Sequence, residues 1–436
     1  MIRTSYYQDL TKMNTFGMKV KARCFMEYDS VADLVDIEFE ELARPVLHIG
    51  GGSNLLFTDD FKGTVLHSKI DFIEILEDGN CDTSERHCDT SERHRDIPER
   101  HCDIPERHRD IPERHCERSV AISTPVLVSV GAGVVFDDFC AWAAKEGLWG
   151  VENLSYIPGE VGASAVQNIG AYGVEVKDVI HKVYCYDTLE EEFVSFSVEE
   201  CGYGYRDSIF KNPEIKGRYI VTHVVFTLSR EPQPRLDYAH LKEAVAEAAS
   251  LSSDPRLPGG RHPLAEGGMS LPSDTTSAFD ARVTPAIIRK VIIKIRKEKL
   301  PEPSVVGSAG SFFKNPVITL EHFARIESAA KVEHGPDYKV PHYIIESQTL
   351  TPHCEERSDV AIPTTTVKVP AAWMIEQCGW KGKRSGGAAI WEKQPLVIVN
   401  YTGNAYPEEI IGLEKRIIAS VKAKFGVDLH PEVEHV

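Results

Sequence analysis

Five heptapeptides stand in tandem at residues 81–115, and no compact fold can bury them. They read CDTSERH, CDTSERH, RDIPERH, CDIPERH and RDIPERH. A seven-residue period is typical of coiled coils, but the repeats lack paired apolar positions, and Pro98, Pro105 and Pro112 would break a helix. The tract is too polar to build a core of its own. We therefore expect a disordered or loosely extended surface loop that interrupts a folded chain.

Two further stretches look like insertions. HCERSVAIST (115–124) recurs in similar form as HCEERSDVAIPT (353–364), and 250–280 is rich in Gly, Pro and Ser. Two copies of one element at unrelated sites suggest inserted DNA that stayed in frame. The His–Cys doublets of the repeats could bind a metal, but their spacing matches no common zinc pattern. Inert insertion is the favoured interpretation, and we assign no metal ligands.

Length and charge limit the remaining possibilities. A chain of 436 residues is expected to form two or three domains. The formal net charge of −17 argues against generic binding to nucleic acid or to anionic membranes. We find no apolar stretch of membrane-spanning length and no signal peptide, so we expect a cytoplasmic protein. The cysteines outside the inserts stand singly among apolar neighbours, which predicts buried, reduced thiols.

Between the inserts, apolar periodicity predicts an α+β fold. Residues 45–51 and 63–68 have the composition of short strands around a turn. Helical spacing of Val135, Phe139, Trp142 and Ala143 predicts a helix that stops at Gly147. A second apolar stripe, Ile410 to Phe425, ends at Gly426, and a short helix around Trp373 and Met374 ends near Gly379. Strands and helices alternate without a regular βαβ rhythm, which disfavours a doubly wound sheet.

Two glycine-rich segments could hold a ligand. HIGGGSNLLF (48–57) follows a strand, and consecutive glycines let backbone N–H groups approach phosphate oxygens. ENLSYIPGEVGASAVQNIGAYG (152–173) has four glycines and suits a long loop wrapped on an extended ligand. Each also has a plain structural interpretation, as a tight turn and as an irregular core connection.

Three shorter segments carry candidate catalytic side chains. GYGYRDSIFK (202–211) contains Arg206, GSAGSFFKNP (307–316) contains Ser311, and LHPEVEHV (429–436) contains Glu432. Taken singly, an arginine, serine or glutamate of this kind is usually a surface or capping residue.

Together and in this order, the five segments resemble the UDP-N-acetylenolpyruvoylglucosamine reductase (MurB) family, type I. The segments NTFG (14–17), KLPEP (299–303) and SGGAAIWEKQPLVIVN (385–400) fit as well. The resemblance implies an FAD-binding fold of the vanillyl-alcohol oxidase (PCMH) type in two subdomains, plus an α+β substrate-binding domain. The implied boundaries are 1–74 and 126–230 for the FAD subdomains, 75–125 for the repeat insert, 231–425 for the substrate domain with inserts at about 248–282 and 348–365, and 426–436 for the segment with the catalytic glutamate.

The resemblance also implies the binding residues. Non-covalent FAD would contact Gly50, Gly51, Gly52, Ser53, Asn54, Leu55, Ile157, Pro158, Gly159, Ala163, Ser164, Gln167, Asn168, Gly170, Tyr172 and Gly173. The UDP-sugar would contact Tyr205, Tyr238, Lys299, Asn315, Lys368 and Gln377, with Tyr238 on the diphosphate. NADPH would reduce the FAD and leave before UDP-N-acetylglucosamine enolpyruvate enters the same site.

The implied chemistry gives the three catalytic residues distinct tasks. Hydride addition to the CH₂ of an enolpyruvyl ether requires stabilisation of the charge that develops at C2 and on the carboxylate. Arg206 can hold that carboxylate through two hydrogen bonds. Glu432 would donate as the neutral acid or orient a donor, because burial beside an anion favours the protonated form. Ser311 would deliver the proton to C2.

Two other functions stay open from the sequence alone. A different flavoenzyme of the same fold, such as a hydroxy-acid oxidase, would share the glycine-rich loops but would not need Arg206, Ser311 and Glu432 together. A non-catalytic interaction protein could use the repeat tract to recruit a partner, although no insert interrupts any of the five segments. We expect the enzyme to be a monomer.

Overall fold

The computed structural model describes residues 1–76, 125–238, 240–252, 283–345 and 365–436. The heptapeptide tract, its His–Cys doublets and the repeated element at 353–364 lie outside the described residues. The sequence predicted a loop at 250–280, but residues 250–252 belong to the helix α4 (Leu241–Ser252). The rest of that stretch lies outside the described residues.

The first sheet is formed near the N-terminus. Its strand order is β1 (Arg3–Asp9), β2 (Lys21–Tyr28), β5 (Phe61–Ser68) and β3 (Val46–Ile49), with α1 (Val31–Val35) following β2. The two strands predicted at 45–51 and 63–68 are present, but they are parallel neighbours, with Leu47 opposite Val65. The prediction of a simple turn between them was therefore wrong: parallel partners need a crossover, and this one contains the short strand β4 (Leu55–Leu56) and the glycine-rich segment.

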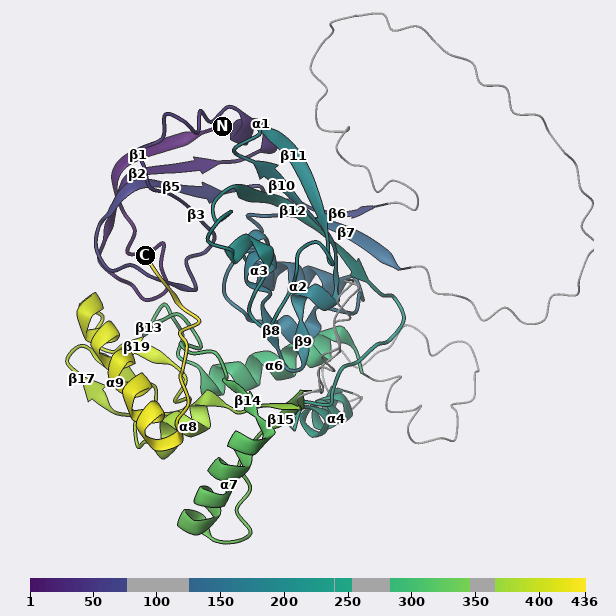
Figure 1. The fold of residues 1–436 in the computed structure, drawn as a ribbon. Coiled ribbons are helices and arrows are strands. Elements are labelled where there is room, and N and C mark those ends of the chain that lie inside the picture. The colour runs from purple at the N-terminus through teal and green to yellow at the C-terminus, as the bar shows by residue number, and fades with distance from the viewer. Residues whose placement is uncertain (77–124, 239, 253–282, 346–364) are drawn as a thin grey trace, which may run out of the picture.

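The second sheet is antiparallel throughout. Its order is β11 (Glu192–Ser197), β10 (Ile180–Asp187), β12 (Tyr219–Leu228), β7 (Val126–Gly131) and β6 (Ile73–Leu76). The helices α2 (Phe136–Lys145) and α3 (Val161–Gln167) lie between this sheet and the lower part of the molecule (Figure 1). The helix predicted around Phe139 is confirmed as α2, and Gly147 follows it with a left-handed φ of 70°.

The segment at 152–173 is less irregular than the sequence predicted. Besides α3 it contains the 3-10 turn η2 (Glu152–Leu154) and the strand β8 (Gly170–Ala171), which pairs with β9 (Val174–Glu175) ahead of η3 (Val176–Asp178). Small residues permit this, because Gly162 packs with its Cα face against Ala132, where a Cβ would come within 2.9 Å of the alanine methyl carbon. A short helix therefore forms inside the expected loop.

The third unit combines helices with two small sheets. The helices are α4, α6 (Pro285–Lys299), α7 (Leu320–His334), α8 (Ala371–Gln377) and α9 (Pro407–Phe425). One sheet orders β13 (Gly307–Ser308), β19 (Ile398–Asn400), β18 (Ala388–Ile390) and β17 (Arg384–Ser385), and the other orders β14 (Val317–Thr319), β16 (Thr366–Lys368) and β15 (Tyr343–Ile345). The predicted stripe is confirmed as α9, which ends at Gly426 with φ of 68°, and the predicted short helix is confirmed as α8.

The hydrophobic core joins the first and third units. One cluster of buried side chains contains Leu10, Phe16 and Val65 from the N-terminal region together with Phe312 and Ile417 from the third unit. The Phe16 carbonyl also accepts a hydrogen bond of 3.0 Å from the Asn400 side chain. The N-terminal region and the substrate-side unit therefore share one core, while the second sheet has its own.

All three inserts fall in connections between elements that touch each other. Residues 77–124 connect the paired strands β6 and β7, 346–364 connect β15 and β16, and 253–282 connect the packed helices α4 and α6. The ends of each connection are therefore close together whatever its length.

Two global expectations can be compared with the described part of the chain. It contains no helix long and apolar enough to cross a membrane. Cys24, Cys140, Cys185 and Cys201 are free and buried, as expected, whereas Cys378 is free but only half-buried.

Candidate active site

Glu432 lies on the C-terminal segment, and this segment rises from α9 towards the first sheet (Figure 1). Its N–H donates to the Phe312 carbonyl at 2.8 Å, and its carbonyl accepts from the Asn54 side chain at 3.0 Å. Two residues on, β20 (Glu434–His435) pairs in parallel with β4. The segment is therefore fixed between the glycine-rich crossover and the stretch after β13 that carries Ser311.

Arg206 occupies a strained turn that points its guanidinium at Glu432. Gly204 and Asp207 close the turn through reciprocal backbone hydrogen bonds, and Arg206 between them has a φ of 56°, a region that side-chain-bearing residues rarely adopt. Its Nε lies 3.0 Å from Glu432 Oε1, and both side chains are largely buried. An arginine and a carboxylate predicted from segments more than 200 residues apart are therefore in direct contact.

The other contacts of Arg206 hold its two terminal nitrogens. Nη1 donates to the Asn168 carbonyl at 3.2 Å and Nη2 to the Gly170 carbonyl at 2.5 Å. A guanidinium has five N–H groups, so among the described residues one N–H on each terminal nitrogen is left for another acceptor. This is the donor pair that a carboxylate ligand would need.

Ser311 is the residue before Phe312, the backbone partner of Glu432. It follows Gly310, whose φ is 68°. Its side chain is exposed, unlike the two phenylalanines after it. The three predicted catalytic residues therefore come together from three separate segments.

Three predicted substrate residues join the same cluster. The Lys368 ammonium lies 4.1 Å from the centre of the Tyr205 ring. The Asn315 side chain accepts from the Ala371 N–H at the start of α8 at 2.9 Å, and Asn315 also hydrogen-bonds Tyr205. Burial raises the pKa of the Tyr205 hydroxyl and lowers the pKa of the Lys368 ammonium. Tyr205, Asn315 and Lys368 thus form a half-buried polar wall beside Arg206.

The two glycine-rich segments are in contact with each other. Ser53 Oγ donates to the Pro158 carbonyl at 3.0 Å, and a Cβ on Gly51 would meet the Gly159 Cα at 3.4 Å. Gly52 cannot be replaced without movement, because its φ is 60° and a Cβ would lie 1.9 Å from the Met13 carbonyl oxygen. Side-chain-free backbone is thus exposed along this junction at Gly51, as a diphosphate would require.

A half-buried cation supports the same junction. Arg296 of α6 is half-buried, and its Nε donates to the Tyr156 carbonyl at 3.0 Å. Burial lowers the pKa of Arg296, but an arginine keeps its charge over the whole physiological range. It also hydrogen-bonds Tyr172, another expected cofactor residue. The exposed glycine backbone and this charge fit the diphosphate of FAD, so the residues present suit the expected cofactor.

Several side chains that were expected to contact the cofactor form hydrogen bonds within the protein. Asn54 holds Glu432 through its side chain and Glu434 through its carbonyl. Asn168 caps α3 with a φ of 46°, and its amide donates to the Gly204 carbonyl at 2.7 Å. The Ser164 hydroxyl donates to the Val161 carbonyl. Leu55 lies in β4, and Ile157, Ala163 and Gly173 lie within the same two segments. These side chains build the site, and any cofactor contact through Asn54 or Ser164 is left to the backbone.

Tyr238 lies at the edge of the cofactor segment. Its ring packs at 5.7 Å on Tyr172 and stacks at 6.2 Å on Tyr343. Burial is the main cause that raises the pKa of the Tyr238 hydroxyl, and the neighbouring Tyr343 adds to it. The tyrosine thus stands between the expected cofactor and substrate sides.

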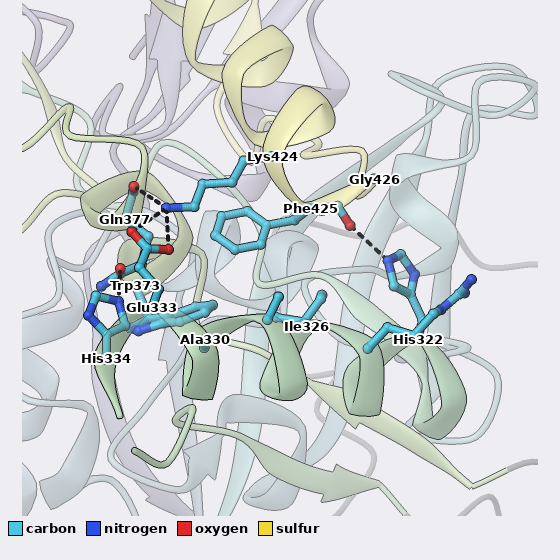
Figure 2. A pocket seen from close by; sticks show the side chains of 12 residues that line it. His322, Ile326, Ala330, Glu333, His334, Trp373, Gln377, Lys424, Phe425 and Gly426 are labelled. Carbon is cyan, nitrogen blue, oxygen red and sulfur yellow. Dashed lines mark hydrogen bonds and ion pairs between the residues drawn. The ribbon is translucent and has the colours of Figure 1, made fainter. Parts of the chain in front are cut away.

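The remaining two expected substrate residues lie elsewhere. Lys299 ends α6 with an exposed side chain. Gln377 lines a cavity of about 450 Å³ between α7, α8 and α9, where its side chain bonds His334 and its carbonyl bonds Lys424 (Figure 2). The apolar part of this cavity is formed by Ile326, Trp373 and Phe425. The contacts of Gln377 are thus separate from those of Arg206.

Sequence reasoning missed two residues of the site. Arg296 gave no signal, because a basic residue near the end of a helix is normally solvated. Lys211 ends the 3-10 turn η4 (Ile209–Lys211) and donates to Gln167 Oε1 at 2.9 Å. It stands in the segment that contains Arg206, so that segment's other polar side chains were the available signal.

Comparison with known proteins agrees with this architecture. The model of the UDP-N-acetylenolpyruvoylglucosamine reductase C-terminal domain matches residues 302–436, and that of an FAD binding domain matches residues 114–192. A solved UDP-N-acetylenolpyruvylglucosamine reductase (MurB) from Thermus caldophilus superimposes with a TM-score of 0.52 at 18% identity, covering 100% of this chain and 98% of that one. The likeness supports the fold predicted from the sequence.

Curated relatives extend the match to the full chain. UDP-N-acetylenolpyruvoylglucosamine reductase of Bacteroides fragilis (strain YCH46) is 40% identical over 428 residues, covering 98% of both chains. The protein of the same name from Porphyromonas gingivalis is 35% identical over 440 residues, covering 100% of this chain and 99% of the relative. With identity at this level over both whole chains, this chain belongs to the UDP-N-acetylenolpyruvoylglucosamine reductase family of FAD-dependent oxidoreductases.

Proposed function

We propose that the protein reduces UDP-N-acetylglucosamine enolpyruvate to UDP-N-acetylmuramate in peptidoglycan precursor synthesis, with NADPH as the hydride source. FAD, when bound along the glycine-rich junction, supplies the hydride that is added to the enolpyruvyl CH₂. The protein acts in the cytoplasm as a monomer. The FAD subdomains span 1–74 and 126–230 and the substrate domain 231–425, with the C-terminal segment completing the site.

In this proposal Arg206 binds the carboxylate of the enolpyruvyl group. Its two remaining terminal N–H groups face the substrate, and its charge stabilises the negative charge that develops on the carboxylate as hydride arrives. The contacts with Asn168, Gly170 and Glu432 keep the guanidinium from turning away. Pre-organisation of this kind is worth most where water is excluded.

Ser311 donates the proton to C2, and Glu432 orients a hydrogen-bond donor beside the substrate carboxylate. Glu432 is the partner of Arg206 Nε, so a substrate carboxylate on the two terminal nitrogens would bring a second negative charge close to Glu432 and favour its protonation. The polar wall of Tyr205, Asn315 and Lys368 would bind the sugar and its diphosphate, with Tyr238 on the diphosphate. The places of Lys299 and Gln377 fit only an outer part of the substrate.

One observation carries this proposal: the contact between Arg206 and Glu432 with Ser311 on the neighbouring backbone. A hydroxy-acid oxidase would need a free base that removes a proton, whereas the carboxylate of this cluster, Glu432, is held on Arg206. The assembly therefore suits reduction of a carboxylate-bearing double bond better than oxidation of an alcohol.

The half-reactions of Ser311→Ala test the proposal. Reduction of the flavin by NADPH needs no proton at C2 and should proceed almost normally. Transfer to the enolpyruvyl sugar should slow by about 10²–10⁴-fold, the usual contribution of a positioned general acid. Stopped-flow absorbance of the flavin follows each half separately. Equal slowing of both halves would indicate a disturbed flavin site, and no slowing of either would remove Ser311 from the mechanism.

A simpler experiment separates the proposal from its alternatives. The purified protein should be yellow, should lose its flavin colour with NADPH, and should regain it with the enolpyruvyl sugar. Recolouring by a hydroxy acid's keto product instead, or the absence of flavin, would support the other flavoenzyme or the interaction protein.

A further inference from the structure

Lys211 makes contacts for which the proposed mechanism has no use. Its ammonium donates to Gln167 Oε1 at 2.9 Å and to the backbone carbonyl of Arg206 at 3.1 Å. The residue is half-buried, and η4, which it ends, is tied to α3 through a hydrogen bond of 2.6 Å from Ser208 Oγ to the Val166 carbonyl. Lys211 thus bridges the helix of the cofactor segment and the turn that presents Arg206.

The turn needs such a support. Arg206 has a left-handed φ of 56°, which costs a residue with a side chain about 1–3 kcal/mol. In that conformation the Arg206 carbonyl accepts a hydrogen bond from Lys211, while the Arg206 side chain contacts Glu432. The ammonium therefore stabilises the backbone of the residue whose side chain is proposed to hold the substrate.

Burial and the neighbouring carboxylates act on the pKa of Lys211 in opposite directions. Burial lowers the pKa of Lys211, and the positive charge of Lys314 lowers it further, while Asp207, Glu432 and Glu434 oppose the change. A half-buried ammonium is costly unless hydrogen bonds and neighbouring carboxylates compensate for its lost hydration, and Lys211 has both. A merely solvated lysine would avoid this position.

We propose that Lys211 is a positioning residue for the reduction: it fixes the backbone of Arg206 and thereby aims the guanidinium at the substrate carboxylate. The inference rests on the proposed role of Arg206. It extends that role, because the same ammonium also binds Gln167, an expected cofactor residue. Lys211 thereby fixes the position of Arg206 relative to the segment that is expected to bind the flavin.

The first experiment uses Lys211→Met, which keeps the aliphatic stem and removes the charge and both hydrogen bonds. The variant should retain FAD, and its reduction by NADPH should stay within about threefold of the parent. Transfer to the enolpyruvyl sugar should slow by roughly 10- to 100-fold, the order expected when a catalytic group is misplaced by about 1 Å. Lys216→Met is the matched control, because Lys216 is five residues on and its ion pair with Glu434 is solvent-exposed.

A binding measurement provides a readout that overall destabilisation would not change. UDP-N-acetylmuramate carries the carboxylate that Arg206 is proposed to hold, and UDP-N-acetylglucosamine does not. Lys211→Met should weaken binding of the first to the FAD-loaded protein by about tenfold and leave binding of the second unchanged. Equal weakening of both ligands, or of neither, would overturn the inference.

The decisive test is additivity with Arg206→Lys. If Lys211 acts through Arg206, the double variant should be no slower in the transfer step than Arg206→Lys alone, within about threefold. Multiplied losses would mean that Lys211 acts independently and would overturn the inference. Near-normal transfer by Arg206→Lys would refute the proposed role of Arg206 itself, which is a different outcome. Should Lys211→Met lose its flavin, Lys211→Gln, which keeps a hydrogen-bond donor, is measured in its place against the same three criteria.

Discussion

Removal of the repeat tract should leave the enzyme active and slightly more stable. The tract connects β6 and β7, whose partners Leu76 and Leu127 lie opposite each other. Replacing residues 77–124 by a four-residue Gly-Asn turn shortens the connection from about 50 residues to about 5. Loop-closure entropy scales as (3/2)RT ln n, so the shorter loop should stabilise the native state by about 2 kcal/mol if the tract makes no contacts of its own. For a protein of this size, the melting temperature should rise by a few degrees.

The assay compares the melting temperature, flavin content and turnover of the shortened protein with those of the parent. Turnover should stay within a few-fold, because no site residue belongs to the deleted segment. A deletion that also removes β6, residues 73–124, is the matched control and should be destabilised, since it takes an edge strand from the second sheet. A shortened protein that is less stable or largely insoluble would refute the reasoning and would mean that the tract packs on the core.

Further changes test the site and its support. Arg206→Lys keeps the charge but not the paired donors and should lower kcat/KM by about a hundredfold or more; near-normal kinetics would make Arg206 structural. Gly170→Ala places a Cβ 2.8 Å from Arg206 Nη1 and 2.9 Å from the Val174 carbonyl oxygen and should slow sugar reduction, as stopped-flow traces would reveal. Burial opposes ionisation of Asp137, yet hydrogen bonds from Arg289 and from the backbone lower the pKa of that carboxyl. Asp137→Asn should therefore cost about 2 kcal/mol in urea unfolding at pH 7, and the difference should shrink below about pH 4, where the parent protonates too; a pH-independent difference would contradict this. Acid precipitation should release FAD into the supernatant, and flavin in the pellet would indicate a covalent link.

Local patterns in the sequence were enough to predict three helices, α2, α8 and α9, and the two strands β3 and β5. The stripes that ended at Gly147 and Gly426 became α2 and α9 because helical periodicity and a left-handed glycine are local properties. The parallel pairing of β3 with β5 could not be read from the same evidence, since nothing in either strand encodes its partner. The short helix α3 was missed because small residues pack closely enough to override their weak propensity for a helix.

The candidate site was predictable as a set of residues but not as a set of contacts. Arg206 contacts Glu432, and Ser311 precedes the residue whose carbonyl binds the Glu432 N–H, yet Asn54 and Asn168 hold backbone of the site rather than offering free side chains. An amide in a glycine-rich segment looks the same in the sequence whether it faces a ligand or a neighbouring strand. Lys211 and Arg296 escaped notice for the same reason, because their importance comes from burial that only the fold creates.

The shared core between the N-terminal region and the third unit has a consequence for how the chain folds. The Phe16 ring packs on Phe312, and the Phe16 carbonyl accepts a hydrogen bond from the Asn400 side chain. Both partners are synthesised long after Phe16. During synthesis the early strands must therefore stay unfinished while several hundred residues follow, whereas the second sheet has a core cluster of its own and packs on the first sheet through Tyr186 and Ile220. We expect the second sheet to form first and flavin uptake to come late, after residues from both halves of the chain have closed around one another.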